Sequence, residues 1–148
     1  MASKNFELEN VLKYRAEIER MRKQEFAEAK QDFERASDKL CQEEALVEDL
    51  SRDFCHRHGE LDSIEDLRMF ASFFARKREE IKEQKERVDY LGHVLSDCRM
   101  TMLDATKDKK VLESLKEKKA KEFRLAMEQK EQEFIDEIAV QKKEKTSP

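Results

Sequence analysis

The chain has 148 residues, a length that normally makes one globular domain. Charged residues make up 45% of it, against roughly 25% in ordinary soluble domains, and the formal net charge is −4. With two glycines and one proline, compact turns are scarce and the chain cannot fold back on itself often. This composition argues against an ordinary globular core and leaves two possibilities, a disordered chain or long helices.

The first expected element is a helix from about residue 5 to residue 58. Its seam positions from Phe26 onward recur in steps of three and four, which is typical of coiled coils, because a 3.5-residue repeat keeps one stripe facing a partner helix. Before Phe26 the heptad is broken, since Met21 fits the earlier phase that includes Ile18, and such a stutter locally unwinds a supercoil. The seam positions are Phe26, Ala29, Phe33, Ala36, Leu40, Glu43, Val47, Leu50 and Phe54.

The sequence CHRHGELDS separates this helix from the next one. Gly59 is expected to end the first helix, because glycine takes a positive φ without a Cβ clash. Ser63 followed by Asp66 resembles a capping box at the start of the second helix, with Asp in place of the usual Glu. A short loop over about 59–63 makes the two helices antiparallel neighbours.

The second expected helix runs from about residue 64 to residue 143 and carries a longer seam. Gly92 lies inside it, where glycine costs about 1 kcal/mol relative to alanine; the glycine either allows a close approach of the partner helix or is only tolerated. The seam positions are Leu67, Phe70, Phe74, Lys77, Ile81, Gln84, Val88, Leu91, Leu95, Cys98, Met102, Ala105, Lys109 and Leu112.

These regular repeats make disorder the weaker interpretation. The expected fold is all-α, a long antiparallel two-helix coiled-coil hairpin whose second helix is longer than the first, and residues 1–148 form a single domain. With a loop centred near residue 60, residue n lies opposite roughly 120 − n. The charge pattern agrees with this register, because residues 24–53 carry a balance of −6 and residues 67–96 a balance of +2.

In this register the end of the second helix has no partner within the chain. It still carries apolar residues close to one helical stripe, and a lone amphipathic helix is normally stabilised by what it packs against. The stripe therefore predicts a partner, with a different register or self-association as the alternative. Its residues are Leu115, Phe123, Met127, Phe134 and Ile138.

Phenylalanine is concentrated in the segment LRMFASFFARK, residues 67–77. Phe70 and Phe74 belong to the seam, whereas Met69 and Phe73 do not fit it. Apolar groups off the seam of a two-helix hairpin cannot be buried by the hairpin alone, so this segment predicts an exposed aromatic patch, which usually marks an interaction site. A local tuck of residues 59–75 over the end of the hairpin is the alternative.

The chemical motifs are few. Cys41, Cys55 and Cys98 are an odd number without a disulfide spacing, as in a reducing cytosol. Cys55, His56 and His58 invite a zinc interpretation, but a structural zinc site needs four ligands and no second cluster supplies the rest. We therefore expect no metal. The chain has no glycine-rich phosphate loop and no nucleophile paired with a base, and a two-helix hairpin lacks a concave pocket, so we expect no enzyme activity and no cofactor.

Residues 107–121 contain seven lysines against three acidic residues. The net charge is negative and no aromatic stacking platform accompanies the lysines, so we expect no nucleic-acid partner but a solvated face or a counterpart for an acidic protein surface. The opening MASKNFELENVL has no apolar signal region, and no stretch approaches transmembrane length. A cytoplasmic, soluble and elongated protein is expected.

Both ends of the chain carry a family resemblance. The opening FELENVLKYRAEIER, residues 6–20, resembles the start of the FliJ family of flagellar export proteins, in which F-x-L-x-x-V-L-x-Y-R is typical. The segment KVLESLKEKKAKEFRLAMEQKEQEFIDEIAV, residues 110–140, is similar to the carboxy-terminal signature of that family. Together with length, charge content and two-helix layout, the resemblance covers essentially the whole chain.

The resemblance implies a component of the flagellar type III export apparatus, with a coiled coil similar to the stalk (gamma) subunit of rotary ATP synthases. It implies that one end enters the hexameric ring of the export ATPase, that another part meets the membrane export gate, and that export chaperones are recycled. The protein would then associate peripherally with the cytoplasmic face of the membrane, without inserting into it. The implied ring contacts are Phe6, Leu8, Val11, Leu12, Tyr14, Phe123, Met127, Phe134 and Ile138. The implied gate contacts are Met69, Phe70, Phe73 and Phe74.

Two alternatives stay open at this point. A structural, self-associating coiled coil would need the stripe at the end of the second helix to pair with itself. The equivalent stalk protein of a virulence-type secretion system would share the fold and differ in its partners. The VLKYR and DEIAV sequences favour the flagellar family.

Overall fold

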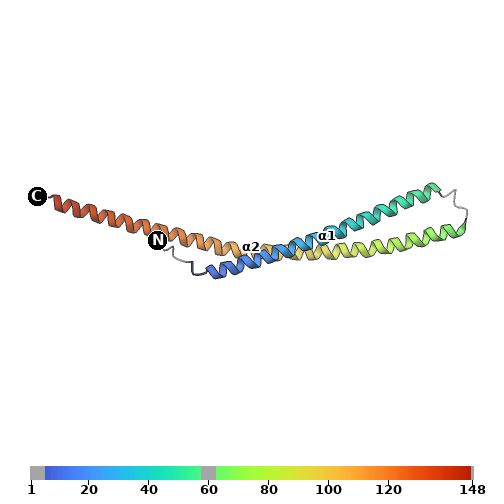
Figure 1. The fold of residues 1–148 in the computed structure, drawn as a ribbon, viewed down its shortest axis with the longest axis horizontal. Coiled ribbons are helices and arrows are strands. Elements are labelled where there is room, and N and C mark those ends of the chain that lie inside the picture. Colours follow the sequence, from blue (N-terminus) through green and yellow to red (C-terminus); the bar gives the residue numbers. More distant parts are fainter. Residues whose placement is uncertain (1–5, 58–62, 148) are drawn as a thin grey trace. The chain divides into compact units, whose positions relative to one another are not determined.

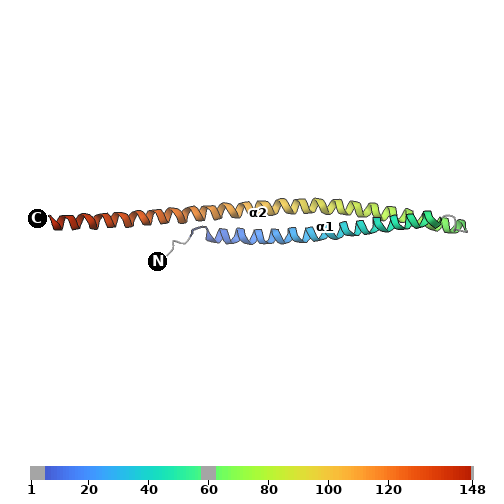
Figure 2. The ribbon, with the colours of Figure 1, turned by 90° about the horizontal axis from the view of Figure 1, so that it is seen from above.

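A computed structural model describes residues 6–57 and 63–147 of the chain. These residues form two helices, α1 (Glu9–Arg57) and α2 (Ile64–Thr146), and no strand occurs among them. Over residues 20–57 and 64–103, Figures 1 and 2 show the two helices running with antiparallel chain directions. The all-α helical hairpin with a longer second helix, predicted from the sequence, is confirmed.

The first helix starts later than the sequence predicted. The backbone N–H of Glu9 donates to the carbonyl of Phe6 at 3.0 Å, and that of Leu12 donates to the carbonyl of Leu8 at 2.9 Å. Residues 6–8 therefore precede α1 as a turn. At the other end α1 stops at Arg57, and Gly59, the predicted end signal, lies outside the described residues.

The second helix begins where its capping signal predicted. The hydroxyl of Ser63 accepts a hydrogen bond from the backbone N–H of Asp66 at 3.2 Å, which is the amino-terminal half of a capping box. Acidic Glu65 and Asp66 occupy the first turn, where negative charge interacts favourably with the helix dipole. The start of α2 is thus fixed locally, independently of what α1 does.

The second helix continues slightly beyond its predicted end at about residue 143. The hydroxyl of Thr146 donates to the carbonyl of Lys142 at 2.8 Å, and the backbone N–H of Ser147 donates to the carbonyl of Lys143 at 3.2 Å. These bonds satisfy carbonyls that a helix end otherwise leaves free. The last turn therefore persists to Thr146.

The contacts divide the chain into two units. Unit one joins Met1–Glu19 with Asp104–Pro148, and unit two is Arg20–Leu103. Each unit pairs a segment of α1 with an antiparallel segment of α2, and each is described by itself. The assignment of residues 1–148 to a single domain stays a prediction.

In unit two, the helices meet along the predicted seam. All the α1 positions predicted for the seam, from Phe26 to Phe54, are buried or half-buried. The α2 positions from Phe70 to Met102 are covered in the same way, and Leu67 alone among the predicted α2 positions is exposed. The polar seam positions are covered too, so spacing predicted the interface better than hydrophobicity did.

Large residues face small ones across this seam. The side chain of Gln84, only 7% exposed, donates from Nε2 to the backbone carbonyl of Ala36 at 2.9 Å. Gly92 lies against the ring of Phe33, and a Cβ added to the glycine would lie 3.5 Å from ring atom Cε2. A small residue on one helix thus makes room for a long or aromatic side chain on the other.

The register differs from the one deduced from the loop position. Paired residues have numbers that add to between 120 for Ala36–Gln84 and 129 for Glu44–Lys85, whose Nζ and Oε1 are 3.4 Å apart. Other cross-helix pairs are displaced from the predicted sum of 120 by between about one and two helical turns, as in Arg15–Asp108 and Glu19–Lys109. Side-chain packing sets the register in steps of three and four residues, so the midpoint of the loop fixes it only approximately.

In unit one, ion pairs join the helices. Glu19 is 5% exposed, and its carboxylate accepts a hydrogen bond from Nζ of Lys109 at 3.2 Å. This hydrogen bond, together with the nearby Glu113, raises the pKa of Lys109. Two further pairs cross between the helices in this unit, Arg15–Asp108 at 3.3 Å and Glu9–Lys116 at 2.8 Å.

Replacing Gly92 by alanine is expected to stabilise the hairpin by about 1 kcal/mol, because alanine is the better helix former. The added methyl group would meet the Phe33 ring at an ordinary van der Waals distance. Thermal unfolding followed by circular dichroism measures the change as a rise in Tm.

Ser96→Ala, at an exposed position of the same helix, is a control for helix propensity without a cross-helix contact. A fall in the Tm of Gly92→Ala, with no fall in Ser96→Ala, would show that the helices need the glycine for their close approach.

Candidate interaction surfaces

Three phenylalanines close the hairpin near its loop. The ring of Phe54 on α1 lies 5.1 Å from that of Phe70 and 6.1 Å from that of Phe74, both on α2. The rings of Phe70 and Phe74 are 6.4 Å apart and stacked. All three are half-buried, so Phe70 and Phe74 pack in the seam and offer a partner only part of their surface.

The two apolar residues off the seam differ in their surroundings. Met69 is 71% exposed. Phe73 is half-buried, since its ring meets Phe74 edge-on at 5.9 Å and Nζ of Lys77 lies 5.9 Å from its centroid. The alternative of a tuck over residues 59–75 fails for its described part, because residues 64–75 belong to α2; residues 59–62 lie outside the described chain.

Met69 and Phe73 belong to a shallow groove of about 340 Å³ on α2. We call it the α2 groove; its lining residues are Arg68, Met69, Ser72, Phe73 and Arg76. They stand one or four positions apart and therefore share one face of the helix. Sequence reasoning missed Arg68, Ser72 and Arg76, although residues 67–78 contain four basic residues and no acidic one.

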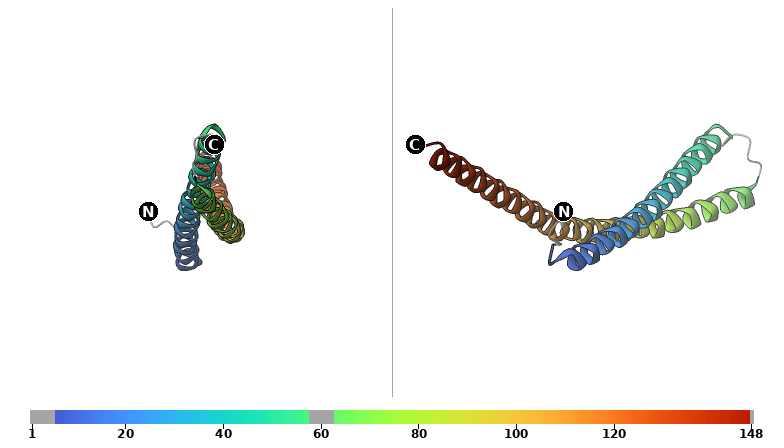
Figure 3. Two further views of the ribbon diagram at one scale, coloured as in Figure 1. Left: turned by 90° about the vertical axis from the view of Figure 1, so that its right-hand side faces the viewer. Right: turned by 60° about the vertical axis from the view of Figure 1, so that its left-hand side comes forward.

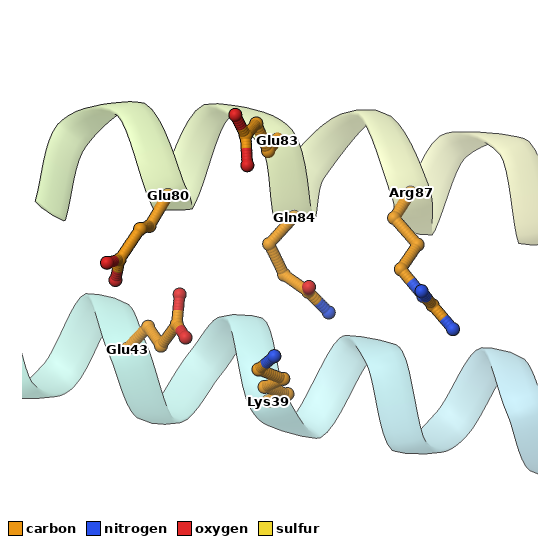
Figure 4. Close-up of a pocket in the computed structure, with 6 residues that line it drawn as sticks. All are labelled: Lys39, Glu43, Glu80, Glu83, Gln84 and Arg87. Atoms are coloured by element: carbon orange, nitrogen blue, oxygen red, sulfur yellow. The ribbon is translucent and has the colours of Figure 1, made fainter. Parts of the chain in front are cut away.

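A second hollow, of about 610 Å³, lies between the helices in unit two (Figure 4). Figure 4 shows Gln84 and Arg87 directed from α2 toward α1, where Lys39 and Glu43 stand. Its lining residues are Lys39, Glu43, Glu80, Glu83, Gln84 and Arg87. We call this set the polar layer.

The polar layer is a structural feature of the seam. Lys77 donates to the Glu80 carboxylate at 2.9 Å, and this hydrogen bond lowers the pKa of Glu80. Oε2 of Glu43 is buried and makes no hydrogen bond within the described residues. Such groups disfavour sliding of one helix along the other, because a shifted register would bury Gln84 and Glu43 against apolar neighbours.

In unit one, α2 continues past the first residue of α1. Lys116 pairs with Glu9, and from there to Thr146 the helix extends for about 45 Å at ~1.5 Å per residue (Figure 3). Along this stretch Phe123, Phe134 and Ile138 are exposed, Phe134 by 64%, while Met127 is half-buried. Leu115 is half-buried as well, but residues 128–147 are exposed throughout, so the part of the predicted stripe at Phe134 and Ile138 has no covering segment among the described residues.

The start of α1 carries exposed apolar groups of its own. Tyr14 is 63% exposed, and Leu8 and Val11 are also exposed. Phe6 and Leu12 are half-buried. All five are in unit one together with the exposed part of α2, so the implied ring contacts from the two ends of the chain belong to the same unit.

The remaining sequence motifs are exposed or paired. Cys55 and His56 are exposed, and His58 lies outside the described residues. Within 6–57 and 63–147, no three His, Cys, Asp or Glu side chains gather in a way that could hold a metal ion. The lysine-rich segment is partly used by the hairpin itself, since Lys109 and Lys116 pair with acidic residues of α1.

Neither described helix has a stretch that is both long enough and apolar enough to cross a membrane. The fold described above is a two-helix coiled-coil hairpin, and both of its units carry exposed apolar surfaces. The sequence model described as Flagellar FliJ protein matches residues 3–145. The chain belongs to this family, and family membership makes it a component of the flagellar export apparatus. No curated protein and no solved structure matches the chain.

Replacing Phe54 by alanine is expected to lower the free energy of unfolding by about 2 kcal/mol, less than the roughly 3–5 kcal/mol typical of buried phenylalanines, because the ring is half-buried. Met69→Ala, on the exposed side of α2, should change it by less than about 0.5 kcal/mol. Urea denaturation of both variants measures the two values. Equal losses would mean that Met69 is packed in a core.

Proposed function

We propose that this protein is a non-enzymatic stalk and escort protein of the flagellar export apparatus. In this role it engages the export ATPase ring, the membrane export gate and the substrate chaperones. It stays peripheral to the membrane and is held at the cytoplasmic face by these partners. Family membership supports the setting, and the distribution of uncovered apolar residues supports the choice of contact surfaces.

The observation that carries the ATPase contact is the uncovered stripe on α2 in unit one. Phe134 and Ile138 are exposed there, four residues apart on one face of a helix that is otherwise strongly charged. Full burial of such side chains contributes about 1.5–3 kcal/mol each. An isolated helix gains little from its own backbone bonds, so a partner that covers this stripe would stabilise both itself and the helix.

The start of α1 extends the same proposed surface. Val11 and Tyr14 are exposed in unit one and stand three residues apart, on one side of α1. An apolar helix pair of this kind suits the inner surface of a protein ring, where side chains from several subunits surround it. Phe6, Leu8, Leu12, Phe123 and Met127 complete the proposed contact.

The gate contact is proposed for the loop end of the hairpin in unit two. Phe73 and Met69 lie off the seam, and both line the α2 groove. Phe74 supports Phe73 from the seam through an edge-on ring contact, and Phe70 stacks on Phe74 behind it. Phe70 and Phe74 are half-buried, so they add part of their own surface to the proposed contact. Exposed aromatic side chains held by a rigid helix are frequent anchors of protein interfaces.

Phe134→Ser combined with Ile138→Ser is expected to abolish most of the stimulation of the export ATPase by the full chain. The two changes remove the apolar anchors, and they leave the hairpin folded because both positions are exposed. Phosphate release by the ATPase, measured against the concentration of added protein, gives the stimulation.

The matched control is Leu125→Ser with Val140→Ser, which removes two exposed apolar residues from other faces of the same helix. It should stimulate as the unchanged protein does. Equal loss in both pairs would contradict a defined stripe. Loss of self-association in place of lost stimulation, measured by light scattering, would favour a structural coiled coil instead.

Phe73→Ala is expected to weaken binding to the cytosolic part of the export gate by about tenfold, as is common when an interface anchor is truncated. Its Tm should fall less than that of Phe54→Ala. The ring contact and the cation contact of Phe73 are both with residues of α2, Phe74 and Lys77, and do not join the two helices. Surface-immobilised gate protein and a titration of the hairpin measure the affinity. A Tm loss as large as that of Phe54→Ala would assign Phe73 to the core.

A further inference from the structure

The α2 groove combines an apolar floor with positive charge. Arg68, Ser72 and Arg76 follow one another at four-residue spacing, so they stand in a row along one side of the helix. Met69 and Phe73 stand at the same spacing one position further on. A polar row with an arginine at each end thus lies beside an apolar row, and the two rows together form an amphipathic surface about as long as a short peptide.

The groove faces away from the hairpin seam. At about 100° per residue, its centre lies about 130° around the helix axis from the seam positions Phe70, Phe74 and Lys77. The seam side is covered by Phe54 of α1. The groove side is therefore a surface that α1 does not cover within the described residues.

The charges of the groove are only weakly engaged by the hairpin, since Arg76 helps to lower the pKa of Glu80, after Lys77, without pairing with it. No ion pair involves Arg68 or Arg76 anywhere in residues 6–57 and 63–147, and both side chains are exposed. Lys77, by contrast, is committed to Glu80 at 2.9 Å. Since residues 67–78 contain no acidic side chain, positive charge is concentrated here in a chain whose net charge is −4.

We propose that the α2 groove binds an acidic segment of a partner protein, with one apolar side chain of that segment seated on Met69 and Phe73. Arg68 and Arg76 hold carboxylates on either side of this anchor, through the bidentate geometry that the guanidinium group favours. The proposal deepens the gate contact proposed above and rests on it for the identity of the partner. The chemistry of the occupant follows from the groove itself.

The dimensions favour a peptide segment over an extended anionic surface. From Arg68 to Arg76 the groove spans about 12 Å along the helix at ~1.5 Å per residue, which matches about two turns of a bound helix. Acidic residues Glu79 and Glu80 follow directly after the basic segment. A flat anionic membrane would meet these carboxylates as well, whereas a short segment ends before them.

The test uses the full chain and a labelled peptide of about twelve residues, rich in glutamate, with leucine and phenylalanine at its centre. Fluorescence anisotropy at low salt should show binding, and raising the salt concentration should weaken it, because salt screens exposed charges. Arg68→Gln combined with Arg76→Gln should weaken binding by about tenfold or more. The same peptide with glutamine in place of glutamate should bind as weakly to the unchanged protein.

The matched control is Arg78→Gln with Lys82→Gln. It removes the same charge from the same helix, at two exposed positions outside the groove, and should leave peptide binding within about twofold. Equal weakening by the two double variants would overturn the groove in favour of general attraction to a basic helix. Unchanged Tm values in both variants, by circular dichroism, show that the fold is kept.

Two further arms separate the possible occupants. Vesicles of phosphatidylcholine with phosphatidylserine should not bind; binding of vesicles without binding of the glutamate peptide would overturn the proposal in favour of a membrane. Dimerisation through the groove by way of acidic residues of a second copy, detected by sedimentation, would overturn the proposal in favour of a second copy of this chain.

The cytosolic part of the export gate gives the last comparison. Gate binding that the groove variant weakens and the control variant keeps supports the proposal. Gate binding that neither variant changes overturns the acidic-segment proposal but leaves the gate contact standing. Peptide binding without gate binding contradicts the proposed gate contact while the chemistry of the groove holds.

Discussion

Two helices can cover each other along one stripe only, and the structure follows from that constraint. No described side chain is fully buried, and the apolar residues that are covered most are alanines, where the helices can come close. Each larger side chain keeps part of its surface in water, so hydrophobic burial is spread thinly over a long seam. Under these conditions a few polar contacts gain weight, because they distinguish one register from another even where they add little stability. Gln84 against the Ala36 carbonyl and Glu19 with Lys109 are contacts of this kind.

The same constraint explains why exposed apolar surface is abundant without any sign of a defective core. A residue off the seam has nothing in the chain to cover it, as Met69 and Tyr14 show. In a globular protein such residues would be scattered and uninformative. Here they fall at helical spacing, on the α2 groove in unit two and along α2 in unit one. Their order on helix faces, rather than their exposure alone, supports their assignment to partners.

Much of this fold could be predicted from spacing, because a heptad states which side of a helix faces its neighbour. Glu43, Lys77 and Gln84 were assigned to the seam by position against their polarity, and all three are covered. The register was less predictable, since a shift by one helical turn again aligns seam with seam. The pairing of Lys109 and Lys116 with α1 could not be read from the lysine-rich segment, because it depends on that register. Arg68 and Arg76 escaped notice for another reason: a basic residue on a charged helix has no distinguishing spacing until the apolar residues beside it are placed.

The contacts between α1 and α2 differ between the two units. Unit two relies on aromatic and aliphatic side chains, with Phe54, Phe70 and Phe74 closing it near the loop. Unit one relies more on ion pairs, and those of Arg15 with Asp108 and of Lys116 with Glu9 are partly open to water. Exposed pairs contribute little and are screened by salt, so these two pairs add little to the stability of unit one. Segments of low local stability are those that can rearrange on binding. A unit with weakly stabilising ion pairs and an uncovered apolar stripe is therefore suited to completing its packing with residues from a partner.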